Sequence, residues 1–179
     1  MGKKITVKNV RLSFPSLFQK ANFNGDATKY EATLLLDKET HADSIKEIQA
    51  AIKSMITSDL KGAKLGDDKL CLKDGEGIDY DGYENCYSLK ASNKKRPMVI
   101  DRDKTPLCED DNKPYAGCYV NAVIELWAQN NNYGKRINAN LLGVQFFKDG
   151  EPFGDGVGAS VDDFDAFDDD DEDYSGLLG

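Results

Sequence analysis

The chain is organised around one stretch, 114–151, whose alternating pattern predicts two long, paired β-strands. In its first half an apolar residue occupies every second position, which is the period of a strand with one buried face: Cys118, Val120, Ala122, Ile124 and Leu126. A polar, turn-rich segment follows at 129–135, and a second strand-like run at 136–147 ends at Asp149-Gly150. The two runs predict an antiparallel hairpin and, with it, a mainly β fold.

Aromatic and basic side chains lie on the other face of this hairpin and around its turn. They are Tyr119, Trp127, Tyr133, Lys135 and Arg136. Because aromatic rings stack on unpaired bases and Lys or Arg neutralise phosphates, such a hairpin can serve as a platform for single-stranded nucleic acid. The alternative is that Trp127 and Tyr119 pack beneath a loop and meet no ligand.

The N-terminal segment 3–12 also alternates and predicts a strand. Its inward face is expected to hold Ile5, Val7 and Asn9, and its outward face Lys4, Thr6, Lys8 and Val10. Ser13-Phe14-Pro15 is expected to end the strand, because proline cannot donate to a strand ladder and restricts the residue before it.

One amphipathic helix is predicted in the first half of the chain. Apolar residues recur at helical spacing over 45–56, Thr40 or Asp43 can cap the N-terminus, and the pattern stops near Leu60. The remaining segments are assigned by shorter patterns: strands at 29–36, 86–91 and 98–100, and little regular structure at 65–82.

Further basic side chains gather in two turns and on the first strand. They are Lys8, Arg11, Lys94, Lys95, Arg96 and Arg102. Lys94, Lys95 and Arg96 are consecutive, and they stand between two expected strands. We interpret them as phosphate contacts, with an ordinary solvated loop as the alternative for a charge run of this kind.

The net charge of -9 is unevenly distributed along the chain. Residues 161–179 hold nine acidic residues and no Lys or Arg. Subtracting these nine from the 32 acidic residues of the chain leaves 23, which equals the 23 Lys and Arg. The body is therefore formally neutral, and the acidic pI does not exclude an anionic ligand for it.

The C-terminal segment is expected to form a disordered tail rather than part of the fold. Residues 1–153 are assigned to the folded domain and 154–179 to a Gly-rich joint and acidic tail, because a dense run of like charge repels itself and buries no core. Apolar residues interspersed with the acids indicate a docking peptide for a basic, apolar groove. The expected partner-binding residues are Phe164, Phe167, Asp168, Asp169, Asp170, Asp171, Glu172, Asp173, Leu177 and Leu178.

No catalytic constellation emerges from the sequence. The chain has one histidine, His41, and four cysteines without a C-x-x-C pair, so neither a His-activated nucleophile nor a zinc site is indicated. The loop acids lack EF-hand spacing. We therefore expect a protein that is not an enzyme and needs no cofactor. A carboxylate-metal nuclease is the alternative, which we disfavour because the acids lie in loops and tail.

The cysteines are interpreted as reduced, mostly buried thiols of a cytosolic protein. No signal peptide is expected, because no apolar run follows Lys3-Lys4, and no segment reaches membrane-spanning length.

Three blocks of the sequence carry a resemblance: VKNVRLSFPSLF, KKRPMVIDRDK and the hairpin block GCYVNAVIELWAQNNNYGKRINANLLGVQFFKDGE. They resemble a long-uncharacterised family of phage proteins, similar in turn to phage single-stranded DNA-binding proteins with an acidic tail. The resemblance implies an OB-fold barrel, sequence-independent binding of single-stranded DNA, and a tail that recruits replication or recombination enzymes and competes with DNA. A homo-oligomer on DNA is compatible with it.

Two departures from that family pattern bear on these expectations. The tail ends in Leu177-Leu178-Gly179 rather than in an aromatic residue, and the helix follows the second strand, so the strand order need not follow the usual OB plan. The main rival function is a protein-binding or DNA-mimic module that acts through the tail without binding single-stranded DNA.

Overall fold

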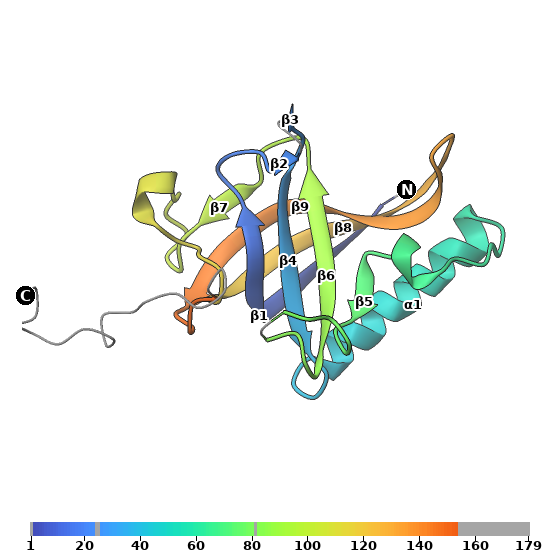
Figure 1. Ribbon diagram of the computed structural model, residues 1–179, viewed down its shortest axis with the longest axis horizontal. Helices are drawn as coiled ribbons and strands as arrows, with labels where there is room; N and C mark the ends of the chain where they lie inside the picture. Colours follow the sequence, from blue (N-terminus) through green and yellow to red (C-terminus); the bar gives the residue numbers. More distant parts are fainter. Residues whose placement is uncertain (1, 24–25, 81, 154–179) are drawn as a thin grey trace, which may run out of the picture.

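The computed structural model describes residues 2–23, 26–80 and 82–153, and Figure 1 shows them as a strongly curved sheet with one long helix beside it. The predicted hairpin is present. Strand β8 (Tyr119–Asn131) pairs antiparallel with β9 (Gly134–Lys148), from Tyr119 opposite Lys148 to Asn131 opposite Gly134. All five apolar residues expected on its inward face are at most 1% exposed, which confirms the orientation of the hairpin.

Five strands close into a ring. Strand β1 (Lys3–Ser16) lies between β4 (Tyr30–Asp37) and β8, and β6 (Cys86–Asn93) pairs with the other side of β4. The ring closes where β6 meets β9 in a parallel pairing at Ser92 and Asn140. The order β1-β4-β6-β9-β8 forms the five-stranded, partly open barrel of an OB-fold, as expected, although the helix stands between β4 and β6.

Shorter elements extend or flank this barrel. They are β2 (Asn22–Phe23), β3 (Asp26–Ala27), β5 (Leu72–Asp74), β7 (Met98–Ile100), and the short 3-10 helices η1 (Asp67–Lys69) and η2 (Glu109–Asp111). Strand β7 lies parallel to β9 and confirms the strand expected at 98–100. The described residues of 65–82 hold little regular structure, as expected, apart from the three-residue elements β5 and η1. β5 is too short to show alternation and is fixed by its pairing with β6.

The expected alternation of β1 was wrong beyond Val7. A bulge between Val7 and Val10 shifts the register, and Asn9 takes a left-handed φ of 55° at this point. The extra residue moves Val10 into the core, where it is fully buried, and leaves Asn9 exposed. Asparagine tolerates a positive φ better than most residues, so the bulge has a local cause that period-two counting ignores.

Strand β1 also continues past its predicted end. Ser13 pairs with Thr33 and Ser16 with Glu31, and the register shifts between these pairs. Pro15 lies inside the irregular segment, where no ladder hydrogen bond is required of it, so proline is tolerated there. The same segment sets Phe14 in a left-handed conformation, with φ at 46°.

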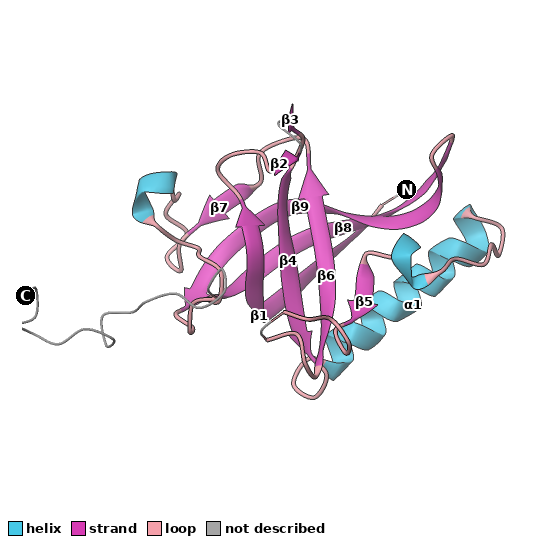
Figure 2. Cartoon of the chain, in the orientation of Figure 1, coloured by secondary structure: helices cyan, strands magenta, loops and turns pink. Residues whose placement is uncertain are grey.

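The predicted helix is α1 (Ala42–Asp59), and Figure 2 shows it as the single long helix among the strands. It packs its buried residues Ile45, Ile48 and Ile52 against the barrel, where it contacts β8, β1, β4 and β9. His41, rather than Thr40 or Asp43, precedes the first helical residue, and its side chain makes no capping hydrogen bond.

The turn before α1 is ordered by side-chain acceptors. Asp37 Oδ1 accepts hydrogen bonds from the backbone N–H groups of Glu39 (2.8 Å) and Thr40 (3.0 Å). The Thr40 bond, followed by the Glu39 bond, lowers the pKa of Asp37. His41 Nδ1 accepts from the Asp37 backbone N–H at 3.0 Å, and its Nε2 lies 3.0 Å from the Lys8 carbonyl oxygen of the β1 bulge.

The acidic tail and the boundary proposed for it lie outside the described residues. Among the residues described, none of the helices combines the length and the apolar character needed to cross a bilayer.

Candidate nucleic-acid interface

A groove of about 1210 Å³ crosses the outer face of β4 and β6 and continues onto the β8–β9 hairpin. The basic side chains that line it are Lys29, Lys73, Lys90, Lys94, Lys95 and Arg136. The acidic lining among the described residues is limited to Glu31. Six positive groups against one negative group give the groove a formal charge of +5, although the body as a whole is neutral. The positive potential of the body is therefore concentrated at this groove.

Aromatic rings gather in the same groove. Of the four large apolar or aromatic side chains that are exposed in the described residues, three line it: Phe14 at 51%, Tyr80 at 56% and Tyr133 at 87% exposure. Exposing rings in one place has a hydrophobic cost, so their clustering indicates a ligand that covers them.

Phe14, Tyr80 and Tyr83 form a connected aromatic cluster. The Phe14 and Tyr80 rings meet edge to face at 5.0 Å, and the Tyr80 and Tyr83 rings lie 5.4 Å apart. Tyr83 is buried, and its hydroxyl shares a 2.9 Å hydrogen bond with Ser13 Oγ. Burial raises the pKa of the Tyr83 hydroxyl. The buried Tyr83 thus supports Tyr80, which in turn contacts Phe14, and both outer rings keep about half of their surface exposed.

Trp127 lies in β8 opposite Asn138 of β9 and lines the groove, in part buried. Its Nε1 is buried and has no hydrogen-bond partner within the described part of the chain. Beyond it, the hairpin turn carries Tyr133, whose backbone N–H donates to Asn131 Oδ1 at 2.9 Å. The long hairpin therefore places one partly buried ring, Trp127, and one largely exposed ring, Tyr133, along the same groove.

The basic triplet is divided by the structure. Lys94 and Lys95 line the groove, and the Lys95 backbone N–H donates to Asn93 Oδ1 at 3.0 Å. Arg96 instead lies with its guanidinium 5.3 Å from the centre of the Phe18 ring and is not part of the groove lining.

Of the two basic residues predicted at the hairpin turn, Arg136 lines the groove and Lys135 does not. Arg136 lines the groove, and its Nη2 donates to the Asp68 carbonyl of η1 at 2.9 Å. Lys135 is exposed beside it but is not among the groove-lining residues.

Arg11 and Tyr119 lie away from the groove, around a second, smaller hollow of about 420 Å³. The Arg11 guanidinium donates to the carbonyls of Gly117 (3.1 Å) and Glu151 (2.6 Å) and stacks 4.0 Å from the centre of the Phe153 ring. It therefore fixes the last described residues of the chain. Tyr119 has Lys148 Nζ 4.9 Å from its ring centre.

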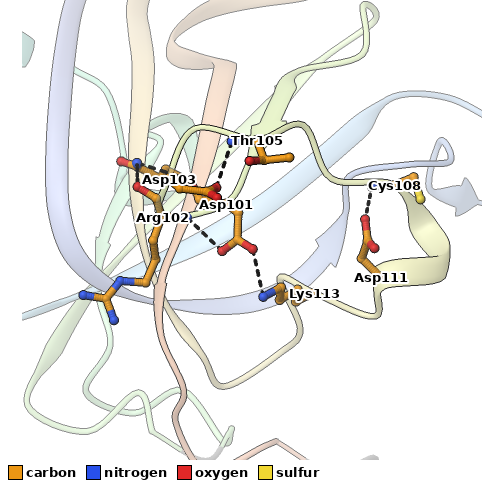
Figure 3. A network of polar contacts seen from close by, with 8 residues as sticks. Asp101, Arg102, Asp103, Thr105, Cys108, Asp111 and Lys113 are labelled. Atoms are coloured by element: carbon orange, nitrogen blue, oxygen red, sulfur yellow. Dashed lines mark hydrogen bonds and ion pairs between the residues drawn. The ribbon is translucent and has the colours of Figure 1, made fainter.

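Arg102 and Lys8 are also outside the groove lining. Figure 3 shows Arg102 in the loop after β7, with its guanidinium directed away from the ion pair between Asp101 and Lys113. That pair measures 2.9 Å from Oδ2 to Nζ, and it is the largest cause of the lowered pKa of Asp101. Arg102 lies 5.5 Å from the centre of the Phe147 ring instead.

The sequence did not predict three of the six basic residues that line the groove, nor the aromatic cluster within it. The missed residues are Lys29, Lys73, Lys90, Phe14, Tyr80 and Tyr83. Lys90 could have been found, because alternation in the predicted strand 86–91 places it opposite the buried Leu89. Phe14 and Tyr80 are 66 residues apart in sequence, and only the fold brings them together.

Within the described ranges, no group of three or more His, Cys, Asp or Glu side chains could hold a metal ion. All four cysteines are free, and two of them, Cys71 and Cys118, are buried, fewer than expected. Burial raises the pKa of the Cys71 thiol to about 12 and that of Cys118 to about 11.

A five-stranded, partly open barrel with a cationic, aromatic-lined groove on one face is typical of the class of OB-fold nucleic-acid-binding proteins. Within this class, residues 3–175 match the family described as "Enterobacter phage Enc34, ssDNA-binding protein", and the chain belongs to that family.

Similar proteins agree with this assignment. Protein p50 of Acyrthosiphon pisum secondary endosymbiont phage 1 is 45% identical over 177 residues, which cover 90% of this chain and 92% of that protein. The bacteriophage Enc34 single-stranded DNA-binding protein, solved in complex with ssDNA, is 37% identical with a TM-score of 0.76, covering 84% of this chain and 89% of that one. The bacteriophage T7 protein gp2.5 shares the fold, with a TM-score of 0.52 at 13% identity over 91% of this chain and 93% of that one.

Proposed function

We propose that this protein binds single-stranded DNA without sequence preference along the groove of β4, β6 and the β8–β9 hairpin. The observation that carries the proposal is the coincidence of six basic residues and three exposed aromatic rings in one groove of a formally neutral body. The Enc34 relative solved with ssDNA supports the choice of ligand.

The proposed mechanism combines phosphate neutralisation with stacking. Lys29, Lys94, Lys95 and the other basic groups replace the counterions of the phosphates, which makes affinity depend on salt. Tyr80, Phe14 and Trp127 offer ring surfaces to unpaired bases, and every base has a face that can stack, so little sequence preference results. The predicted residues outside the groove are not part of this proposed interface.

The wider role proposed for the protein is to protect and organise single-stranded DNA during phage DNA replication or recombination in the host cytoplasm. The segment 154–179 is proposed to recruit replication or recombination enzymes and to compete with DNA. Nine uncompensated acids in 161–179 support this, because a tethered polyanion is held at high local concentration near a cationic groove.

Binding of a labelled oligonucleotide by the full chain and by a chain lacking 161–179 tests both parts. We expect the shortened chain to bind more tightly, with the difference largest at low salt, because the competition is electrostatic. Equal affinities at low salt would refute the competition. If the shortened chain binds no single-stranded DNA, the groove proposal fails, and a module that acts through the tail becomes the better explanation.

A further inference from the structure

A carboxylate in the middle of a phosphate-binding groove has to be accounted for, because it repels phosphate. Glu31 is in this position. It lies within β4, faces Ser92 of β6 across the strand pair, and is the one acidic residue among the described residues that line the groove. Its side chain is 30% exposed, so its charge reaches whatever occupies the groove.

The ion pair that Glu31 makes does not explain its presence. Glu31 Oε2 lies 3.7 Å from Lys90 Nζ, which is too long for a strong hydrogen bond, and the Lys90 side chain is 68% exposed. Exposed pairs of this kind contribute little to stability. The carboxylate oxygens therefore remain free to accept hydrogen bonds from a ligand.

Along the groove floor, Glu31 lies between lysines: Lys29 and Lys94 on one side and Lys90 on the other. Tyr30 pairs with Asn93, so Lys29 and Lys94 stand together beyond the ends of β4 and β6. Glu31 and Ser92 form the next groove-facing pair, and Thr33 and Lys90 the one after it. A phosphate placed at Glu31 would meet a like charge, so a strand whose phosphates lie near the lysines is expected to turn its bases toward Glu31.

Bases differ in what they can offer a carboxylate. Cytosine and adenine carry exocyclic amino groups that donate two hydrogen bonds. Thymine has a single donor, N3–H, and it stands between two carbonyl oxygens that a carboxylate repels. We propose, on the basis of the proposed DNA-binding function, that Glu31 contacts bases and makes the groove disfavour thymine relative to cytosine. This is a bias in base composition added to binding that reads no ordered sequence.

The test compares the affinities of the full-length protein for oligo(dC) and oligo(dT) of equal length at one salt concentration and mildly alkaline pH. The quantity of interest is the ratio of the two affinities, because general electrostatic effects alter both affinities alike. We expect Glu31→Gln to reduce the preference for oligo(dC) by about 5-fold or more, since an amide can also donate to thymine O4. The substitution preserves size, and a melting curve confirms that the variant is folded.

Two variants serve as controls. Glu39→Gln removes an equal charge from an exposed turn outside the groove, and it should leave the ratio unchanged. Lys90→Gln removes the neighbouring cation, and it should weaken both affinities while the ratio stays as in the wild type.

The possible outcomes distinguish failure of the role proposed for Glu31 from failure of the proposed DNA-binding function. If Glu31→Gln raises both affinities by the same factor, Glu31 acts only as a repulsive charge, and the inference is overturned. If the ratio changes as much in Lys90→Gln, the effect belongs to the ion pair, and the inference is again overturned. If the wild-type protein binds neither oligonucleotide, the proposed function itself fails, and this inference fails with it.

Discussion

Replacing Lys94 and Lys95 by alanine removes two of the six basic side chains that line the groove. Both are exposed in the turn after β6, so the substitutions leave the barrel core intact. If each of the six groups contacts one phosphate, the slope of log affinity against log salt is about -0.7 per contact, or about -4 for the wild type. The double variant retains four contacts, and its slope becomes about -3.

These slopes give a measurable difference. Between about 50 and about 200 mM salt, the affinity of the wild type should fall about 300-fold, whereas that of the double variant should fall about 50-fold. Fluorescence anisotropy of a labelled single-stranded oligonucleotide, titrated at several salt concentrations, measures both slopes.

The matched control is Lys46→Ala with Lys53→Ala. It removes the same charge from two exposed positions of α1 that do not line the groove. Its slope should equal that of the wild type. A Lys94/Lys95 variant with an unchanged slope, or a helix variant with the same reduction, would refute the assignment of phosphate contacts to this groove.

Three further predictions concern individual side chains. Trp127→Ala should weaken single-strand binding by roughly 1–3 kcal/mol. Trp127→Phe should retain most of the affinity, because a ring remains and no described residue accepts a hydrogen bond from Nε1; binding and melting are measured on each variant. Iodoacetamide at mildly alkaline pH should modify the exposed Cys108 in the native protein, and Cys71 only after unfolding, because burial raises its pKa to about 12; mass spectrometry of peptides distinguishes them. Lys113 lowers the folded-state pKa of Asp101 below the ordinary 3.8. The ion pair therefore stabilises the fold at neutral pH, and this stabilisation is lost as the pH falls through the lowered pKa. Lys113→Met should lower the melting temperature at neutral pH but not in acid.

Regular alternation made the largest part of the fold predictable. The hairpin, its inward face and the closing strands of the sheet follow from local patterns that the structure preserves. In β1 the pattern failed at Asn9, because a single extra residue reverses every later side chain and only the pairing with β8 reveals the bulge. Strand β5 exists because β6 offers it an edge, and no property of its three residues signals that.

The groove was less predictable than the fold. Residue type and proximity to a turn identified Lys94, Lys95 and Trp127, which the structure brings into one groove. The same criteria selected Arg11, whose charge instead holds the backbone near Phe153. Whether a basic side chain meets solvent, backbone or a groove depends on contacts between distant segments, so composition alone could not separate these cases.

The strand pairings of the ring differ in length, and the groove crosses the shortest of them, the pairing between β6 and β9. β6 and β9 share a single paired position, Ser92 with Asn140, and both residues line the groove; Asn93 Nδ2 adds a 3.2 Å hydrogen bond to the Leu141 carbonyl. A ligand that occupies the groove therefore touches both sides of the place where the barrel can open most easily. Such a ligand holds β6 and β9 together, so it suppresses hydrogen exchange first at the backbone amides around Ser92 and Asn140. At a free ligand concentration of 100 times Kd, binding also stabilises the whole fold by about 2.7 kcal/mol. Local opening of the barrel and release of the ligand then become one linked equilibrium.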